Sequence, residues 1–311
     1  MKLLNQNEDR EIIQFPKSDD FVSKTLIGFK YIQVKAPLQN GKFDYSLLDF
    51  SEKKIIWSKE FDERIDFHFL KEYKNSLVYN FLRHNKTEIQ CFDFMKGDLV
   101  WSVDVTGWFP FQFDKKTVYK NQVRQLVIYQ NLVLVNMHGH VVAFEIETGK
   151  EVWRYNLEQS PVIVYQFILD ESDGHLWIIS AVRKHQKGTL RKINAKTGEI
   201  LWTAAEPWDT HHPEPDYGDR WWWHFSMNKN FIFLTFESGF MGVMDKKTGA
   251  IVEWFKFTKR NGAVNHGHKL LNKTLYQPTD FEFLAIDVSE YFLDGDTMEV
   301  NSRDDRVGII Y

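Results

Sequence analysis

The 311-residue sequence has one cysteine, few prolines and no apolar run of membrane-spanning length. A single cysteine cannot form an intrachain disulfide, which excludes a disulfide-stapled scaffold. Charge of one sign is also lacking, because 39 basic and 43 acidic side chains leave a net charge of −4. We therefore expect no general attraction to nucleic acid or to anionic lipid. The first ten residues turn polar after two leucines, without the apolar core of a signal peptide, so we expect a cytoplasmic protein.

Familiar catalytic motifs are missing as well. The sequence has no glycine-rich dinucleotide or phosphate-binding motif, no His-Glu-x-x-His zinc motif and no Gly-x-Ser-x-Gly nucleophile elbow. Cys91 lies in an apolar run, and we interpret it as a small buried strand residue rather than a nucleophile. No residue is therefore assigned a catalytic role from motifs.

A repeated turn motif is what the sequence does contain. An apolar run ends in an acidic or amide residue, a tight turn follows, and a second apolar run ends in tryptophan. Thr-Gly between two apolar runs predicts a hairpin, and we expect the indole to fill the wedge between one sheet and the next. The acidic or amide residues are Asp49, Asp93, Glu145, Asn194, Asp245 and Asp287, and the tryptophans are Trp57, Trp101, Trp153, Trp202 and, one residue out of phase, Trp254.

Two further β-rich runs precede each motif after the first, such as Val123–Tyr129 and Leu132–Met137 before Glu145. About four strands in every 50 or so residues is the pattern of a propeller blade. The sequence therefore predicts an all-β fold, a single β-propeller of four-stranded blades, with six blades expected and seven left open. Residues 1–293 would form this domain, with an N-terminal strand (Glu11–Phe15 or Phe21–Ile27) closing the ring. Residues 294–311 would be a C-terminal tail or a closing strand.

The repeat resembles the tryptophan-docking motif of the pyrroloquinoline-quinone-type propellers, the quinoprotein-like superfamily. That family form has Ala at position 1, Asp at 3, Thr-Gly at 6 and 7, and Trp at 11. Ala143, Thr148, Gly149 and Trp153 match it best, whereas Lys192 departs at position 1. The resemblance covers roughly residues 40–290 and implies the propeller fold.

The same resemblance raises the question of whether this chain binds a quinone cofactor. Quinoprotein dehydrogenases that resemble this repeat use eight blades, a secretory route, bound calcium and often adjacent cysteines. This chain departs from that pattern in its expected blade number, its start and its one cysteine. We therefore expect no cofactor.

Two long aromatic insertions, residues 106–117 and 207–224, join the last strand of one blade (D) to the first strand of the next (A). The D–A and B–C connections of a four-stranded blade share one face. Long aromatic loops on a rigid scaffold are typical binding elements, although they could instead fold back and cap the ring. The candidate binding face comprises Trp108, Phe109, Phe111, Trp208, His211, His212, Tyr217, Arg220, Trp221, Trp222 and Trp223.

Two His-Gly-His segments supply His138 with His140 and His266 with His268. Alternate residues of an extended strand share a side, so each segment could offer two imidazoles to a metal. The alternative is polar histidines beside a solvated channel, which we favour because a metal site needs three or four converging ligands.

These observations favour a non-enzymatic protein-binding propeller, a scaffold or an inhibitor of the immunity-protein type, that uses the aromatic- and His-rich loop face. The alternative is a small-ligand-binding protein, or a hydrolase or lyase, with a His/carboxylate site at the mouth of the central channel. Asp216 and Asp219 would supply its carboxylates. A third hypothesis is a structural role in envelope assembly, by analogy with the outer-membrane assembly lipoprotein that shares this repeat. The expected partner is another protein, with no nucleic acid and no membrane.

Overall fold

The computed structural model describes residues 21–27, 30–35, 42–49, 52, 54–62, 68–83, 86–108, 111–112, 118–119, 123–137, 140–156, 162–182, 188–204, 222–236, 240–256, 268–278, 283–293 and 300–301. The chain divides into two compact units. One comprises Met1–Leu82 and Ile89–Ser102, and the other comprises Arg83–Glu88 and Val103–Tyr311.

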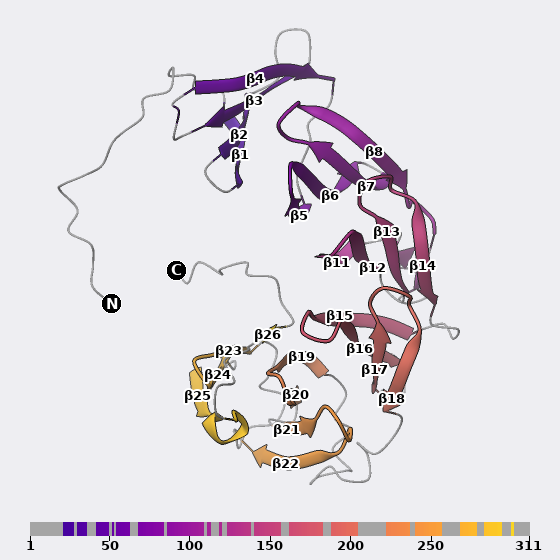
Figure 1. Cartoon of the computed structure of the whole chain (residues 1–311), viewed down its shortest axis with the longest axis vertical. Helices are drawn as coiled ribbons and strands as arrows, with labels where there is room; N and C mark the ends of the chain where they lie inside the picture. The colour runs from indigo at the N-terminus through magenta and orange to yellow at the C-terminus, as the bar shows by residue number, and fades with distance from the viewer. Residues whose placement is uncertain are drawn as a thin grey trace, which may run out of the picture. The chain divides into compact units, whose positions relative to one another are not determined.

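The first unit holds most of two four-stranded antiparallel sheets, each a meander of consecutive strands (Figure 1). The first sheet consists of β1 (Phe21–Ile27), β2 (Lys30–Lys35), β3 (Phe43–Asp49) and β4 (Lys54–Phe61). The second consists of β5 (His68–Tyr73), β6 (Ser76–Arg83), β7 (Lys86–Asp93) and β8 (Asp98–Asp104). Alternate apolar residues such as Leu47, Tyr79 and Phe92 form the buried cluster of this unit.

The second unit contains four more sheets and a short hairpin, β9 (Phe111–Gln112) with β10 (Val118–Tyr119). The third sheet consists of β11 (Val123–Tyr129), β12 (Leu132–Met137), β13 (His140–Glu145) and β14 (Glu151–Asn156). The fourth consists of β15 (Val162–Asp170), β16 (His175–Val182), β17 (Gly188–Asn194) and β18 (Ile200–Ala204).

The last two sheets depart from the four-stranded rule. The fifth consists of β19 (Trp222–Met227), β20 (Phe231–Phe236), β21 (Phe240–Asp245) and β22 (Ile251–Lys256), with β26 (Val300–Asn301) added beside β19. The described part of the sixth consists of β23 (Lys269–Leu271), β24 (Thr274–Pro278) and β25 (Phe283–Asp287), followed by the 3-10 helix η2 (Ser289–Tyr291).

The predicted all-β class is confirmed, and the observed strands lie where the apolar runs were expected. Phe21–Ile27 is β1, the first strand of the first sheet, while Glu11–Phe15 lies outside the described residues. In the segment expected to be a tail, β26 pairs antiparallel with β19. The number of blades and the single-domain boundary stay predictions. Within the described ranges, no helix is long and apolar enough to cross a membrane.

The repeated motif forms the hairpin between the third and fourth strands of a sheet. Its acidic or amide side chain accepts the N–H groups of the turn, as Asn194 Oδ1 does from Lys196 (2.9 Å) and Thr197 (3.2 Å). The turn ends on a glycine with positive φ, 74° at Gly198, a conformation that disfavours other residues. The predicted side-chain acceptor and glycine therefore both shape the turn that leads into the fourth strand of the sheet.

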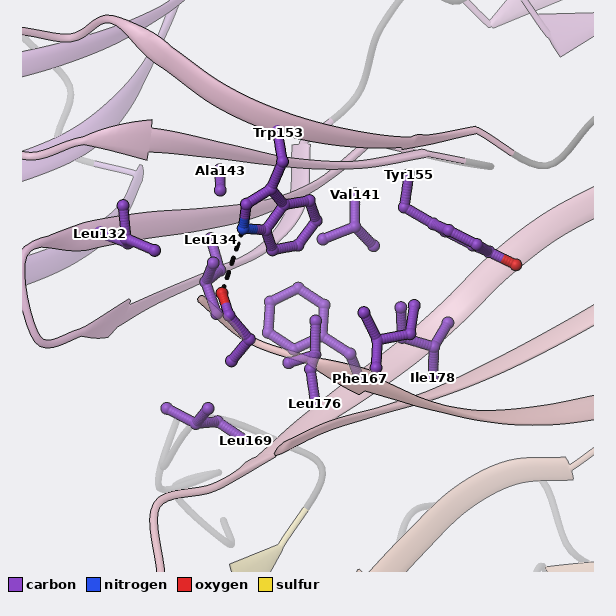
Figure 2. Close-up of a cluster of buried hydrophobic side chains, with 12 residues drawn as sticks. Leu132, Leu134, Val141, Ala143, Trp153, Tyr155, Phe167, Leu169, Leu176 and Ile178 are labelled. Atoms are coloured by element: carbon purple, nitrogen blue, oxygen red, sulfur yellow. Dashed lines mark hydrogen bonds between the residues drawn. The ribbon is translucent and has the colours of Figure 1, made fainter. Parts of the chain in front are cut away.

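A bulge in that outer strand decides which way the tryptophan points. In the third sheet Phe144 pairs with Glu151 and Ala143 with Trp153, so Val152 is the extra residue. Ala143 and Trp153 consequently share one face of the sheet, and both belong to a buried cluster with Phe167 and Ile178 of the fourth sheet (Figure 2). The tryptophan thus packs toward the sheet that follows it in sequence.

Candidate functional site

Trp57, Trp153 and Trp202 each lie against the turn glycine of the next repeat. Trp57 Nε1 donates to Phe94 O at 2.7 Å, and Trp153 Nε1 donates to Ala195 O at 3.1 Å, as the dashed line in Figure 2 marks. A methyl group built on Gly198 would lie 2.8 Å from the Trp153 ring. Glycine is therefore needed at this turn both for its φ and for the approach of the indole.

Trp202 and Trp101 complete the in-phase set. The Trp202 ring lies where a methyl group on Gly249 would have to be, and it meets the buried Trp177 edge-on at 5.8 Å. Trp101 is half-buried on β8.

Trp254 behaves differently because it stands one residue later. The equivalent bulge in the fifth sheet pairs Val243 with Glu253 and Gly242 with Trp254. Glu253 therefore occupies the position that tryptophan has in the other motifs, and Trp254 lies on the opposite face, against the cluster around Trp177. The Glu253 carboxylate accepts a hydrogen bond from the hydroxyl of Tyr291.

The first aromatic insertion begins with a hydrogen-bonded turn, after which Trp108 packs against the third sheet. Thr106 Oγ1 accepts the Thr87 N–H at 2.8 Å, and Thr106 N donates to Asp104 Oδ1 at 2.8 Å. Hydrogen bonds from Thr106 lower the pKa of Asp104. Gly107 in this turn has a φ of 76°.

Trp108 then lies between a buried phenylalanine and an arginine. Its ring centroid is 6.1 Å from that of Phe144, and the guanidinium carbon of Arg154 stands 4.4 Å from the Trp108 ring. Arg154 in turn donates two hydrogen bonds to the carboxylate of Glu151, at 3.0 and 2.5 Å. The Trp108, Arg154 and Glu151 side chains, named here the Trp108 stack, are fixed relative to one another and partly open to solvent.

The remaining predicted binding residues fall in two groups. Phe111 and Trp222 to Trp223 lie in β9 and β19, where the backbone is described. The others lie outside the described residues: Phe109, Trp208, His211, His212, Tyr217, Arg220 and Trp221. For these residues the binding face stays a prediction.

The histidines are only partly placed. His268 is buried, with Nε2 2.8 Å from Ser226 Oγ and Nδ1 3.0 Å from Thr235 Oγ1. Both of its nitrogens are thus used between two sheets. His140 is half-buried on β13, and His138 and His266 lie outside the described residues. Among the residues that the structure describes, no three His, Cys, Asp or Glu side chains gather as a metal site.

Cys91 is buried on β7, as its sequence position indicated. Burial is the largest effect and raises the pKa of its thiol, a hydrogen bond with Ser76 lowers it, and the charge of Asp93 raises it further. A buried thiol of raised pKa is a poor nucleophile.

Sequence reasoning missed a buried ion pair between the fourth and fifth sheets. Asp170 ends β15 and pairs with Lys246 of the fifth motif turn, where the side chains are 0% and 7% exposed. Lys246 Nζ also donates to Asn228 O at 3.3 Å, and Ser172 Oγ donates to Asp170 Oδ1 at 2.6 Å. Arg154 was missed too, although its place three residues after an acidic residue was visible in the sequence.

Comparison with known families decides the identity of the repeat. Two overlapping matches, over residues 41–162 and 85–213, fit the family described as outer membrane protein assembly factor BamB. The chain belongs to this family. The pyrroloquinoline-quinone-type repeat inferred from the turn motif is thereby confirmed.

Solved structures of two quinoprotein dehydrogenases share the fold. Quinohemoprotein alcohol dehydrogenase ADHIIG from Pseudomonas putida HK5 is 16% identical, with a TM-score of 0.51 over 84% of this chain and 51% of that one. The enzyme from Comamonas testosteroni is 11% identical, with a TM-score of 0.51 over 83% and 51%. BamB from Moraxella catarrhalis is 13% identical, with a TM-score of 0.47 over 84% and 70%.

This BamB-type chain spans about half the length of the two dehydrogenases. At these identities the likeness shows the β-propeller fold alone. No curated protein sequence matches the chain significantly.

Proposed function

We propose that this BamB-type chain is a non-enzymatic propeller that binds another protein through its D–A/B–C loop face. The observation that carries the proposal is that Trp108, which belongs to a D–A connection, packs back on the third sheet in the Trp108 stack and stays partly open to solvent. Trp108 is held between Phe144 and Arg154, and Arg154 is held by two hydrogen bonds to Glu151. Tryptophan and arginine dominate interface hot spots, and a pair that is already ordered loses little conformational entropy on binding.

Family membership supports a protein partner in general, since the matching family is described by a protein assembly factor. Within that class we propose a scaffold or an inhibitor of the immunity-protein type. We also propose that the in-phase tryptophans act as docking residues that hold successive blades together. We further propose that the protein works in the cytoplasm and needs no quinone cofactor. Fractionation that places the protein in the periplasm would contradict the cytoplasmic proposal and favour a role in envelope assembly.

The test begins with capture of partners by the wild-type chain from native extract, and continues with the purified partner. Trp108→Ala and Arg154→Ala should each weaken binding by about tenfold or more, which corresponds to about 1.4 kcal/mol. Arg154→Lys should lie between, because lysine keeps the charge but loses the planar fork that pairs with Glu151.

The matched control is Val252→Ser on β22, where an exposed apolar side chain (53% exposed) lies outside the third sheet. It should leave the dissociation constant unchanged in titration calorimetry. Equal affinity for Trp108→Ala, Arg154→Ala and wild type would reject the Trp108 stack as part of the interface. Equal weakening by Val252→Ser would reject the loop face as the determinant.

A further inference from the structure

The contact between the fifth and sixth sheets is built differently from the contacts before it. The last tryptophan of the sequence is Trp254, and its register turns it away from the sixth sheet. Glu253 holds the position from which an indole would otherwise reach the next sheet. The motif position of the fifth sheet therefore offers a carboxylate, and no indole, to the sixth sheet.

Tyr291 reaches back in the opposite direction. It belongs to η2, which follows β25 where other motifs have their glycine turn, and it is 7% exposed. Its ring meets Phe231 at 5.4 Å, Phe233 at 6.0 Å and Phe255 at 6.3 Å, each edge-on. Edge-to-face rings at these distances attract beyond the area they bury.

Polar groups of the fifth sheet secure the same residue. The Tyr291 hydroxyl donates to the Glu253 carboxylate, and Asn228 Nδ2 donates to Tyr291 O at 3.0 Å. Hydrogen bonds to a charged acceptor are about twice as strong as neutral ones. We call Tyr291, Glu253 and Asn228 the Tyr291 latch.

Two strands of the sixth sheet bury few side chains: Leu270 is the buried residue of β23, and no side chain of β25 is fully buried. Leu270 and Leu275 belong to the cluster shared with the fifth sheet, Ile286 packs against it, and Val288 and Phe292 flank η2. His268, which precedes β23, bonds Ser226 and Thr235 of the fifth sheet. Among the described residues this sheet has three strands, and Phe283 on β25 is 64% exposed.

We propose that the Tyr291 latch holds the sixth sheet on the fifth and can break without global unfolding. Strands β23 to β25 then open as a local unit while the third and fourth sheets stay folded. Cooperative units with little buried apolar contact open at a lower free energy than the core. Here the aromatic contact between neighbouring sheets comes from one tyrosine in a three-residue helix, whereas in the third and fourth sheets it comes from a tryptophan on the outer strand. Opening would uncover the aromatic face formed by Phe231, Phe233 and Phe255.

Hydrogen exchange followed by mass spectrometry tests the latch on the full chain. Tyr291→Phe removes only the hydroxyl and should accelerate exchange of the β23–β25 amides by about tenfold, since the lost bond has a charged acceptor. Glu253→Gln keeps an acceptor without the charge and should accelerate the same amides to a smaller extent. Amides of the third and fourth sheets should exchange at the wild-type rate in both variants.

Tyr276→Phe is the matched control, because it deletes a hydroxyl from the same sheet at the ring that stacks on Phe283. It should leave exchange of β23–β25 unchanged. Acceleration that is equal in the third to sixth sheets would overturn the proposal, as would unchanged exchange in Tyr291→Phe. Because the readout involves no partner, its outcome is independent of the proposed binding function.

Discussion

Asp170 and Lys246 form an ion pair that has almost no contact with water. Taking two charges out of water costs several kcal/mol for each ion, and their attraction offsets this only when further hydrogen bonds satisfy both groups. Ser172 supplies such a bond to the aspartate and Asn228 O accepts one from the lysine. Each partner therefore stabilises the fold mainly by neutralising the other.

Asp170→Asn should lower the free energy of unfolding by about 3–5 kcal/mol, because it leaves the Lys246 ammonium buried without a counter-charge. The double variant Asp170→Asn with Lys246→Met should be more stable than Asp170→Asn alone, since it removes the stranded charge. Urea denaturation followed by circular dichroism measures both.

The exposed pair between Lys59 and Asp98, joined at 2.7 Å with side chains 38% and 61% exposed, is the control. Asp98→Asn should cost less than about 1 kcal/mol, because water screens an exposed pair. A double variant less stable than Asp170→Asn would show that the lysine stabilises the site by something other than charge neutralisation.

Tyr291 makes stability depend on pH on the alkaline side. Burial is the largest cause, followed by the hydrogen bond to Glu253, and both raise the pKa of the Tyr291 hydroxyl. A raised pKa in the folded state gives stability that is complete below the unfolded value of about 10 and is lost as pH rises above it. Unfolding free energy should therefore fall more steeply above that pH in wild type than in Tyr291→Phe. Parallel slopes would show that Tyr291 titrates normally.

At the scale of the element, the turn between the third and fourth strands can be tested with two glycines. Gly198→Ala combines a φ of 74° with the Trp153 ring 2.8 Å from the new carbon. Gly107→Ala has the same strain at 76° but nothing within 4 Å. We expect a loss of about 1 kcal/mol at Gly107 and about 3 kcal/mol at Gly198, where the indole and its hydrogen bond must move as well.

Thermal unfolding of the two glycine variants gives this comparison directly. The difference between the two losses measures what the indole contributes to the turn. Equal losses would mean that backbone strain accounts for both and that Trp153 adjusts without cost.

The hairpins were the best predicted elements because their signals are local. Asn194, Thr197 and Gly198 lie within five residues, and their roles follow from turn geometry alone. The register of Trp254 could not be read the same way. A shift of one residue moves a side chain to the other face of a strand, and only the pairing of β21 with β22 shows that Glu253 holds the position of the motif tryptophan.

The candidate site shows the same division between local and distant signals. The sequence marked Trp108 as part of an unusual insertion, but its contact with Phe144 and Arg154 joins residues about 40 apart in the chain. His268 could be read only as a metal ligand or a polar histidine, until Ser226 and Thr235 were found on its two nitrogens. Partners that are distant in sequence leave no pattern in one sequence.

At the scale of the whole molecule, the fold followed from repetition. The same turn recurs through the chain, so the fold class did not depend on any one residue, and family membership agrees with it. Function depends on what distinguishes the copies, such as the insertion at Trp108 and the substitution by Glu253. These departures have no shared pattern, which is why the partner could not be named from the repeat.

The net charge of −4 permits a prediction for the whole chain. At neutral pH and physiological salt, we expect no binding to vesicles of phosphatidylglycerol and phosphatidylcholine, because the mean field repels anions. Below the isoelectric point of about 6.3 the net charge turns positive, and weak binding that added salt removes should appear. Vesicle flotation measures this, with pure phosphatidylcholine vesicles as the control. Flotation with the anionic vesicles at neutral pH would mean that a local basic surface, such as the run from Arg183 to Lys187, outweighs the net charge.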